Sequence, residues 1–189
     1  RKGGKAGLSA GRVQSVAVRL VLEREKEIQD IYESLHKKDN PYDKLHVLSG
    51  AGGIGKTQIA KAYAFRYKDM YKYIFWINAE SETTLYASFI DIARYMRTGS
   101  QMVKNRNEMI NSIKDWLDSH LPWLLIFDNL DSPPLLKQYL PYNTRGHILI
   151  TSRYKDFYFV GILEPQCIEK MSAQDAEKFL LKRTGRTEE

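Results

Sequence analysis

The chain has 189 residues, a formal net charge of +6 and a single cysteine, Cys167. This length suffices for one hydrophobic core of ordinary size, and one cysteine excludes an internal disulfide. The longest apolar run, Trp123 to Phe127, is far too short to cross a bilayer, and no apolar signal segment follows the basic start. These features predict a cytoplasmic protein without a membrane segment.

The positive charge is concentrated at the beginning of the sequence. Residues 1–22 hold five of the 29 basic residues and none of the 23 acidic ones, so the rest is nearly neutral. Residues 1–7 are typical of a flexible basic leader, and apolar residues at helical spacing predict a helix from Ser9 to about Lys38. We therefore separate residues 1–22 from a main domain at 23–189. Because the sequence begins with Arg1 rather than Met, we expect it to be part of a longer one.

Strands and helices alternate along the main domain. Strands are expected at 45–49, 73–78, 123–128, 147–151 and, more weakly, 166–169, and helices at 58–68, 85–96, 103–121 and 172–183, with a short turn or helix at Pro133-Pro134. This alternation predicts an α/β fold: a parallel five-stranded sheet with helices on both faces, a three-layer sandwich preceded by the N-terminal helix.

Residues 50–57 read Gly-Ala-Gly-Gly-Ile-Gly-Lys-Thr and fit the phosphate-loop pattern G-x-x-x-x-G-K-[ST] at every fixed position. Glycines allow backbone N–H groups to face an anion, and the start of the next helix adds its positive dipole end. A ligand-free glycine turn is the alternative, although four glycines before Lys-Thr in this setting rarely arise by chance. The expected nucleotide contacts are Gly50, Gly52, Gly53, Ile54, Gly55, Lys56, Thr57 and Gln58.

Two later strands end in polar residues that suit the same site. Residues 123–128 form an apolar run that ends in Asp128, where phosphate-loop proteins place the acid that holds Mg²⁺. Residues 147–153 end in Thr-Ser-Arg, so these polar residues lie at the carboxyl end of the strand. Ligands of open α/β sheets bind at the carboxyl ends of the strands. Lys56 is expected to reach the β- and γ-phosphates, and Arg153 to contact the γ-phosphate. We predict Lys56, Asp128 and Arg153 as catalytic residues, and Thr57 and Asp128 as Mg²⁺ ligands.

Together these elements resemble the NB-ARC family of STAND signalling NTPases, and the likeness is close to the bacterial and fungal subgroup that carries tetratricopeptide repeats. The resemblance covers roughly residues 21–189 and implies ATP and ADP binding, slow hydrolysis, and a switch that controls self-assembly of a larger protein. It also implies that Arg24 touches the adenosine and that 23–189 form an NB-ARC-type domain truncated at its C-terminal end. It rests on Ser49–Ala60, Phe75–Ala79, Trp123–Asp131, His147–Arg153 and Met171–Gly185.

Three departures from the family pattern modify this expectation. Asn129 stands where many hydrolytic relatives have a second acid, and an amide cannot take a proton from water. We therefore expect weak or no hydrolysis, at most a slow nucleoside triphosphatase; an active ATPase of another phosphate-loop class is the alternative. Glu23 replaces a glycine in the upstream motif that includes Arg24, and the sequence ends before the family's Gly-Leu-Pro and Met-His-Asp elements.

The N-terminal segment carries a second resemblance. Residues 7–20 are similar to a DNA-contacting helix of type IA topoisomerases, and the likeness extends to about residue 28. It implies phosphate contacts by Arg12 and Arg19, so DNA binding through residues 1–28 is a further alternative. Tyr95 begins a Tyr-Met-Arg-Thr-Gly-Ser stretch like that family's nucleophile motif. However, the sequence has no Asp-x-Asp motif for the metal, and Tyr95 follows Ile92 at helical spacing, which favours a tyrosine flanking the core.

Overall fold

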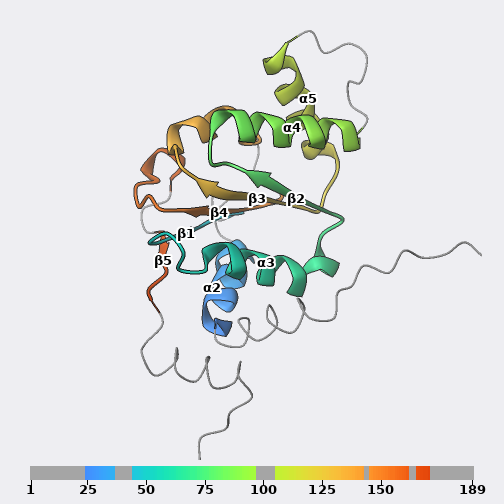
Figure 1. Cartoon of the computed structure of the whole chain (residues 1–189). Coiled ribbons are helices and arrows are strands. Elements are labelled where there is room, and N and C mark those ends of the chain that lie inside the picture. Colours follow the sequence, from blue (N-terminus) through green and yellow to red (C-terminus); the bar gives the residue numbers. More distant parts are fainter. Residues whose placement is uncertain (1–23, 37–43, 97–104, 143–144, 162–164, 171–189) are drawn as a thin grey trace, which may run out of the picture.

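The computed structural model describes residues 24–36, 44–96, 105–142, 145–161 and 165–170. The five strands form one sheet in the order β2-β3-β4-β1-β5, and all neighbouring strands run parallel. Helices cover both faces (Figure 1), which confirms the predicted three-layer α/β fold. The elements are β1 Leu45–Ser49, β2 Tyr73–Asn78, β3 Trp123–Leu130, β4 His147–Ser152 and β5 Gln166–Cys167, with helices α2 Glu25–His36, α3 Lys56–Arg66, α4 Glu82–Met96 and α5 Arg106–Ser119.

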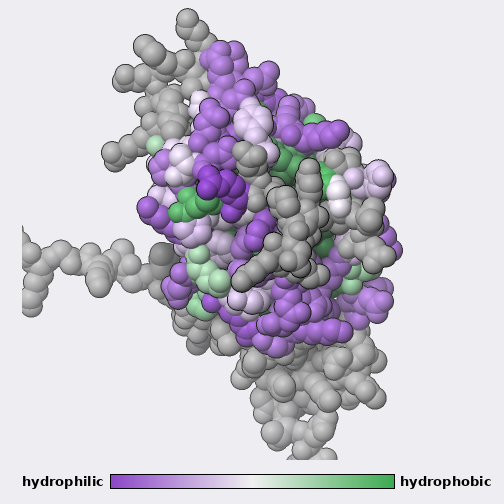
Figure 2. Space-filling view, turned by 180° about the vertical axis from the view of Figure 1, so that it is seen from behind, coloured by the Kyte–Doolittle hydropathy of each residue, from purple (hydrophilic) through white to green (hydrophobic). Residues whose placement is uncertain are grey.

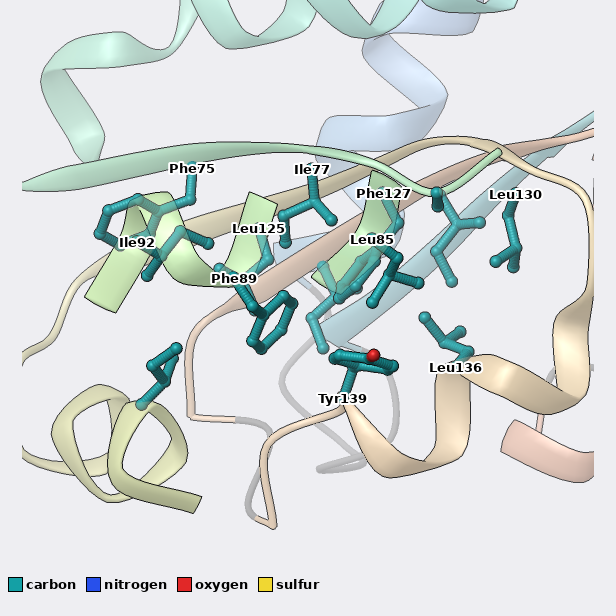
Figure 3. Close-up of a cluster of buried hydrophobic side chains, with 14 of the residues drawn as sticks. Phe75, Ile77, Leu85, Phe89, Ile92, Leu125, Phe127, Leu130, Leu136 and Tyr139 are labelled. Atoms are coloured by element: carbon teal, nitrogen blue, oxygen red, sulfur yellow. The ribbon is translucent and has the colours of Figure 1, made fainter. Parts of the chain in front are cut away.

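The side chains of the central strands alternate between two hydrophobic clusters, one on each face of the sheet. Leu124 and Ile126 of β3 face α2 and α3, whereas Leu125 and Phe127 face α4 and α5. Both faces are buried, which explains why these strands read as continuous apolar runs. Figure 3 shows the cluster beneath α4, where the ring of Phe89 meets that of Tyr139 edge to face with centroids 4.7 Å apart.

The described part of the predicted N-terminal helix is α2, whose Ile28, Ile31 and Leu35 are fully buried against α3 and the sheet. The leader, the rest of that helix and the helix expected at 172–183 lie outside the described residues. Strand β3 extends two residues beyond the predicted end, and β5 stops two residues earlier than predicted.

The surface of the described residues shows no large apolar area in the view from behind. Hydrophilic residues dominate there and hydrophobic ones form separate small patches (Figure 2). Tyr95, expected beside the core, is 66% exposed and contacts Phe75 edge to face, so it lies at the rim of the core. Among the described helices, none is long and apolar enough to cross a membrane.

A chain of polar aromatic groups lies at the end of the sheet where the strands begin, opposite the phosphate loop. The hydroxyls of Tyr63 and Tyr71 are 2.8 Å apart, and that of Tyr71 is 2.7 Å from Nδ1 of His147. The His147 ring also meets the ring of His36 on α2 at 4.5 Å. Burial, followed by the charges of His36 and Lys44, lowers the pKa of His147 to about 3.

This depressed pKa predicts a loss of stability in mild acid. A histidine in the unfolded chain titrates near 6.5, so protonation favours unfolding once the pH falls below that value. Between pH 7 and pH 5 the free energy of unfolding should therefore fall by up to about 2 kcal/mol more in the wild type than in His147→Gln. Glutamine keeps an acceptor for Tyr71 but cannot titrate. Urea denaturation at both pH values measures the difference, and an equal pH dependence would contradict the prediction.

Candidate nucleotide-binding site

The phosphate loop connects β1 to α3 at the edge of the sheet where the strands end. Gly53 and Gly55 have φ angles of 73° and 101°, a left-handed region that glycine adopts without strain. A Cβ placed at Gly52, Gly53 or Gly55 would meet no atom within 4 Å, so this side of the loop faces open space. A Cβ at Gly50 would instead lie 2.7 Å from the carbonyl oxygen of Ile168. Gly50 thus allows the loop to pack closely beside β5, while the later glycines form an open cradle.

Lys56 is only 9% exposed and its ammonium group lies beneath this cradle. Its Nζ donates hydrogen bonds to the carbonyl oxygens of Gly50, at 2.7 Å, and Ala51, at 2.8 Å. Burial, followed by the charge of Arg153, lowers the pKa of Lys56, while the carboxylate of Asp128 acts in the opposite direction. Neither hydrogen-bond partner is an anion, so the loop holds a positive charge that an anionic ligand can neutralise.

Asp128 connects the start of α3 to β4. Its Oδ1 accepts hydrogen bonds from the hydroxyls of Thr57, at 2.8 Å, and Thr151, at 2.6 Å. The Thr151 hydroxyl in turn accepts the backbone N–H of Asn129 at 2.9 Å. The pairing of β3 with β4 shifts between Phe127 and Leu130, and Asn129 has a φ of 59°, as in a β-bulge.

Thr57 and Asp128 fit a magnesium ion that arrives with phosphates. Mg²⁺ prefers oxygen ligands, and it is usually held by one or two carboxylates together with substrate phosphates and water. Here a hydroxyl oxygen and a carboxylate oxygen lie 2.8 Å apart next to the open cradle. Within the described residues, no group of three or more His, Cys, Asp or Glu side chains could hold a metal ion without such a ligand.

Arg153 follows β4 and reaches the same site. Its Nη2 donates to Oδ1 of Asp131, and this contact raises the pKa of the guanidinium. The side chain is 57% exposed, so it can also meet a ligand in the cleft of about 400 Å³ beside the loop. The cleft is lined by Gly52, Gly53, Ile54, Gly55, Lys56, Thr57, Gln58, Glu80, Asn129, Thr151 and Arg153.

The structure brings residues 52–58 and Arg153, all predicted from the sequence as site residues, together at one cleft. Gly50 and Asp128 support the loop without lining the cleft. Arg24 lies outside it, where it donates to Glu27 at 2.6 Å and to the carbonyl oxygen of Glu169 at 3.0 Å. Glu80, which lines the cleft, is not among the predicted residues, although an acid two residues after a strand at this edge of the sheet is a signal for it.

Comparison with known proteins identifies the family. The sequence profile of the NB-ARC domain matches residues 24–186. The chain belongs to the NB-ARC family. NB-ARC domains are nucleotide-binding domains with the P-loop NTPase fold. A "nucleotide-binding leucine-rich repeat (NLR)-like protein" of Hyaloscypha variabilis is 30% identical in an alignment that covers 69% of this chain and 15% of that protein.

Solved structures share the fold of this NB-ARC domain. Cdc6p from Pyrobaculum aerophilum has a TM-score of 0.64 at 18% identity, and Drosophila ORC bound to DNA has 0.60 at 16%. PCH-2 from C. elegans has 0.51 at 19%. These three alignments cover 86%, 91% and 100% of this chain but only 49%, 50% and 58% of the other chains. At such identities the likeness shows the P-loop NTPase fold alone.

The hydrogen bonds of Thr151 predict a measurable role in stability. Thr151→Val keeps the shape of the side chain but leaves the N–H of Asn129 without its acceptor and removes one donor from Asp128. The free energy of unfolding without nucleotide should fall by about 1–3 kcal/mol. Urea denaturation measures it, with Thr83→Val on the exposed side of α4 as a control that stays near the wild type. Equal stability of both variants would show that the bridge contributes little.

Proposed function

We propose that this NB-ARC domain binds ATP and ADP with Mg²⁺ and acts as a signal-transduction switch of the STAND class in the cytoplasm. The observation that carries the proposal is Lys56, a buried side chain whose ammonium group donates to two loop carbonyls and, within the described residues, to no carboxylate, next to an open glycine cradle. A buried cation without an anionic partner is unfavourable on its own, and a phosphate group in the cradle would relieve it.

Each residue at the site has a role in this proposal. The N–H groups of the loop and Lys56 hold the phosphates, with Gln58 at the rim of the cleft. Thr57 and Asp128 hold Mg²⁺, which neutralises charge on the phosphate oxygens when it is bound. Arg153 contacts the γ-phosphate, and that contact distinguishes ATP from ADP. Arg24, which lies on the side of the loop near β5, stays a proposed adenosine contact.

The arrangement of acids favours holding the nucleotide over rapid turnover. Asn129 lines the cleft with an amide where a carboxylate would activate water. Asp131, the next acid along the chain, is ion-paired with Arg153. Asp128 accepts two hydroxyl hydrogen bonds. We therefore propose at most a slow conversion of ATP to ADP.

The proposed control of self-assembly concerns a longer protein that contains this domain. The NLR-like relative is much longer than its matching part, since this chain covers 15% of it. We propose that exchange of ADP for ATP exposes surfaces through which the parent protein self-associates. Binding of nucleic acid through residues 1–28 stays an alternative, and residues 1–23 of that segment, including Arg12 and Arg19, lie outside the described residues.

Nucleotide retention tests the proposed function. Wild-type protein purified under native conditions should release ADP or ATP on denaturation, identified by ion-exchange chromatography. Lys56→Ala should retain little nucleotide and bind ADP roughly 10- to 100-fold more weakly, since a charged hydrogen-bonding group is lost. Lys61→Ala, on the exposed side of the same helix α3, serves as the control. Absence of nucleotide in the wild type, together with equal ADP affinity in all three proteins, would contradict the proposal.

Turnover tests the second part of the proposal. We expect steady-state ATP hydrolysis well below about 1 per second, whereas working ATPases turn over at that rate or faster. Phosphate release at saturating Mg·ATP measures the rate. A turnover of about 1 per second or more would favour the alternative, an active ATPase of another phosphate-loop class.

A further inference from the structure

Glu80 follows β2, and the pairing of β2 with β3 brings it beside Asp128, the proposed metal ligand. β2 pairs in register with β3, so that Asn78 lies opposite Asp128. Beyond the strand, the N–H of Ala79 donates to the carbonyl oxygen of Asp128 at 2.8 Å, and the N–H of Asp131 donates to that of Ala79 at 3.4 Å. The residue directly before Glu80 is thus bonded to both ends of the segment Asp128–Asp131.

The backbone of Glu80 is also fixed by its own neighbours. Its N–H donates to Oδ1 of Asn78 at 3.1 Å, which closes a turn directly after β2. Ser81 then caps α4 through reciprocal hydrogen bonds with Thr84, at 3.0 and 3.2 Å. The side chain of Glu80 is therefore presented from a defined position between β2 and α4, and it lines the cleft together with Lys56.

The carboxylate of Glu80 differs from the other acids near the cleft. Asp128 is bonded to two hydroxyls and Asp131 is paired with Arg153. Within the described part of the chain, no hydrogen bond or ion pair involves the Glu80 side chain. Its charge nevertheless acts on Arg153, since it contributes to the raised pKa of that guanidinium. This carboxylate is exposed and lines the cleft together with Arg153, so it is free to accept a hydrogen bond from a water molecule there.

We propose that Glu80 is the general base of the slow ATP hydrolysis, because position 129, where many hydrolytic relatives have an acid, is occupied by asparagine. This inference rests on the proposed function. The Glu80 carboxylate accepts a proton from a water molecule while the water oxygen bonds to the γ-phosphorus of ATP. The bond from that phosphorus to the bridging oxygen breaks, and ADP leaves with the electron pair. The proton then passes from Glu80 to solvent, which leaves ADP, phosphate and the regenerated carboxylate.

Glu80→Gln tests the assignment because glutamine has the same size and cannot accept the proton. Turnover of Mg·ATP should fall about 100-fold, the lower range of a general base, while the affinities for ADP and for a non-hydrolysable ATP analogue stay within about twofold. The nucleotide that co-purifies should change from mainly ADP in the wild type to mainly ATP in the variant. Glu82→Gln, two residues later and paired with Arg106, is the control and should behave as the wild type.

The possible results separate the inference from the proposed function. Wild-type turnover in Glu80→Gln with unchanged binding would overturn the role of Glu80 and leave the nucleotide switch intact. A parallel loss of affinity and turnover would make Glu80 a binding residue and equally overturn its role as the base. Failure of the wild type to bind nucleotide would refute the proposed function itself. Glu80→Asp, which keeps a shorter carboxylate, should give a turnover between those of the wild type and Glu80→Gln.

Discussion

The site depends on one carboxylate, that of Asp128, which joins segments far apart in the sequence. Hydrogen bonds from Thr57 and Thr151 fix the first turn of α3 and the end of β4 to the end of β3. Such charge-assisted bonds are stronger than neutral ones. These bonds hold the first turn of α3, directly after the phosphate loop, against the sheet. The hydroxyl of Thr57 is thus positioned by Asp128, and both residues are proposed metal ligands.

In the proposed switch, the distribution of charge around the loop favours retention of the nucleotide. Two cations, Lys56 and Arg153, face the position expected for the phosphates, and the burial of Lys56 strengthens its attraction to an anion. The acids, by contrast, are engaged in structure, except for Glu80 at the exposed rim. The proposed base follows the edge strand β2 instead of standing next to the metal ligand on β3, which is consistent with the proposed slow conversion. In the proposed function, the same cleft binds the nucleotide tightly and hydrolyses it slowly.

The sheet, the phosphate loop and the residues Asp128 and Arg153 could be predicted because each depends on a local pattern: an apolar run, a glycine motif, or a polar residue at the end of a strand. For Glu80 the sequence offers only an acid just after a strand, because its nearness to Asp128 depends on β2 pairing with β3. From the sequence, Asn129 is only an amide at a position where many hydrolytic relatives have a second acid. The structure adds that this residue lies in a bulge with a left-handed backbone, a conformation that asparagine tolerates well. The adenosine contact of Arg24 stays a prediction.

Calorimetric titration of the wild type and Asp128→Asn with ADP, with and without Mg²⁺, tests the central claim most directly. Asparagine keeps an oxygen that can accept the hydroxyl bonds, so the fold should persist while the negative charge is lost. We expect Mg²⁺ to strengthen ADP binding in the wild type by tenfold or more, a difference of about 1.4 kcal/mol. In Asp128→Asn the metal-independent affinity should remain and the strengthening by Mg²⁺ should disappear. Equal strengthening in both proteins, or no ADP binding by the wild type, would contradict the account.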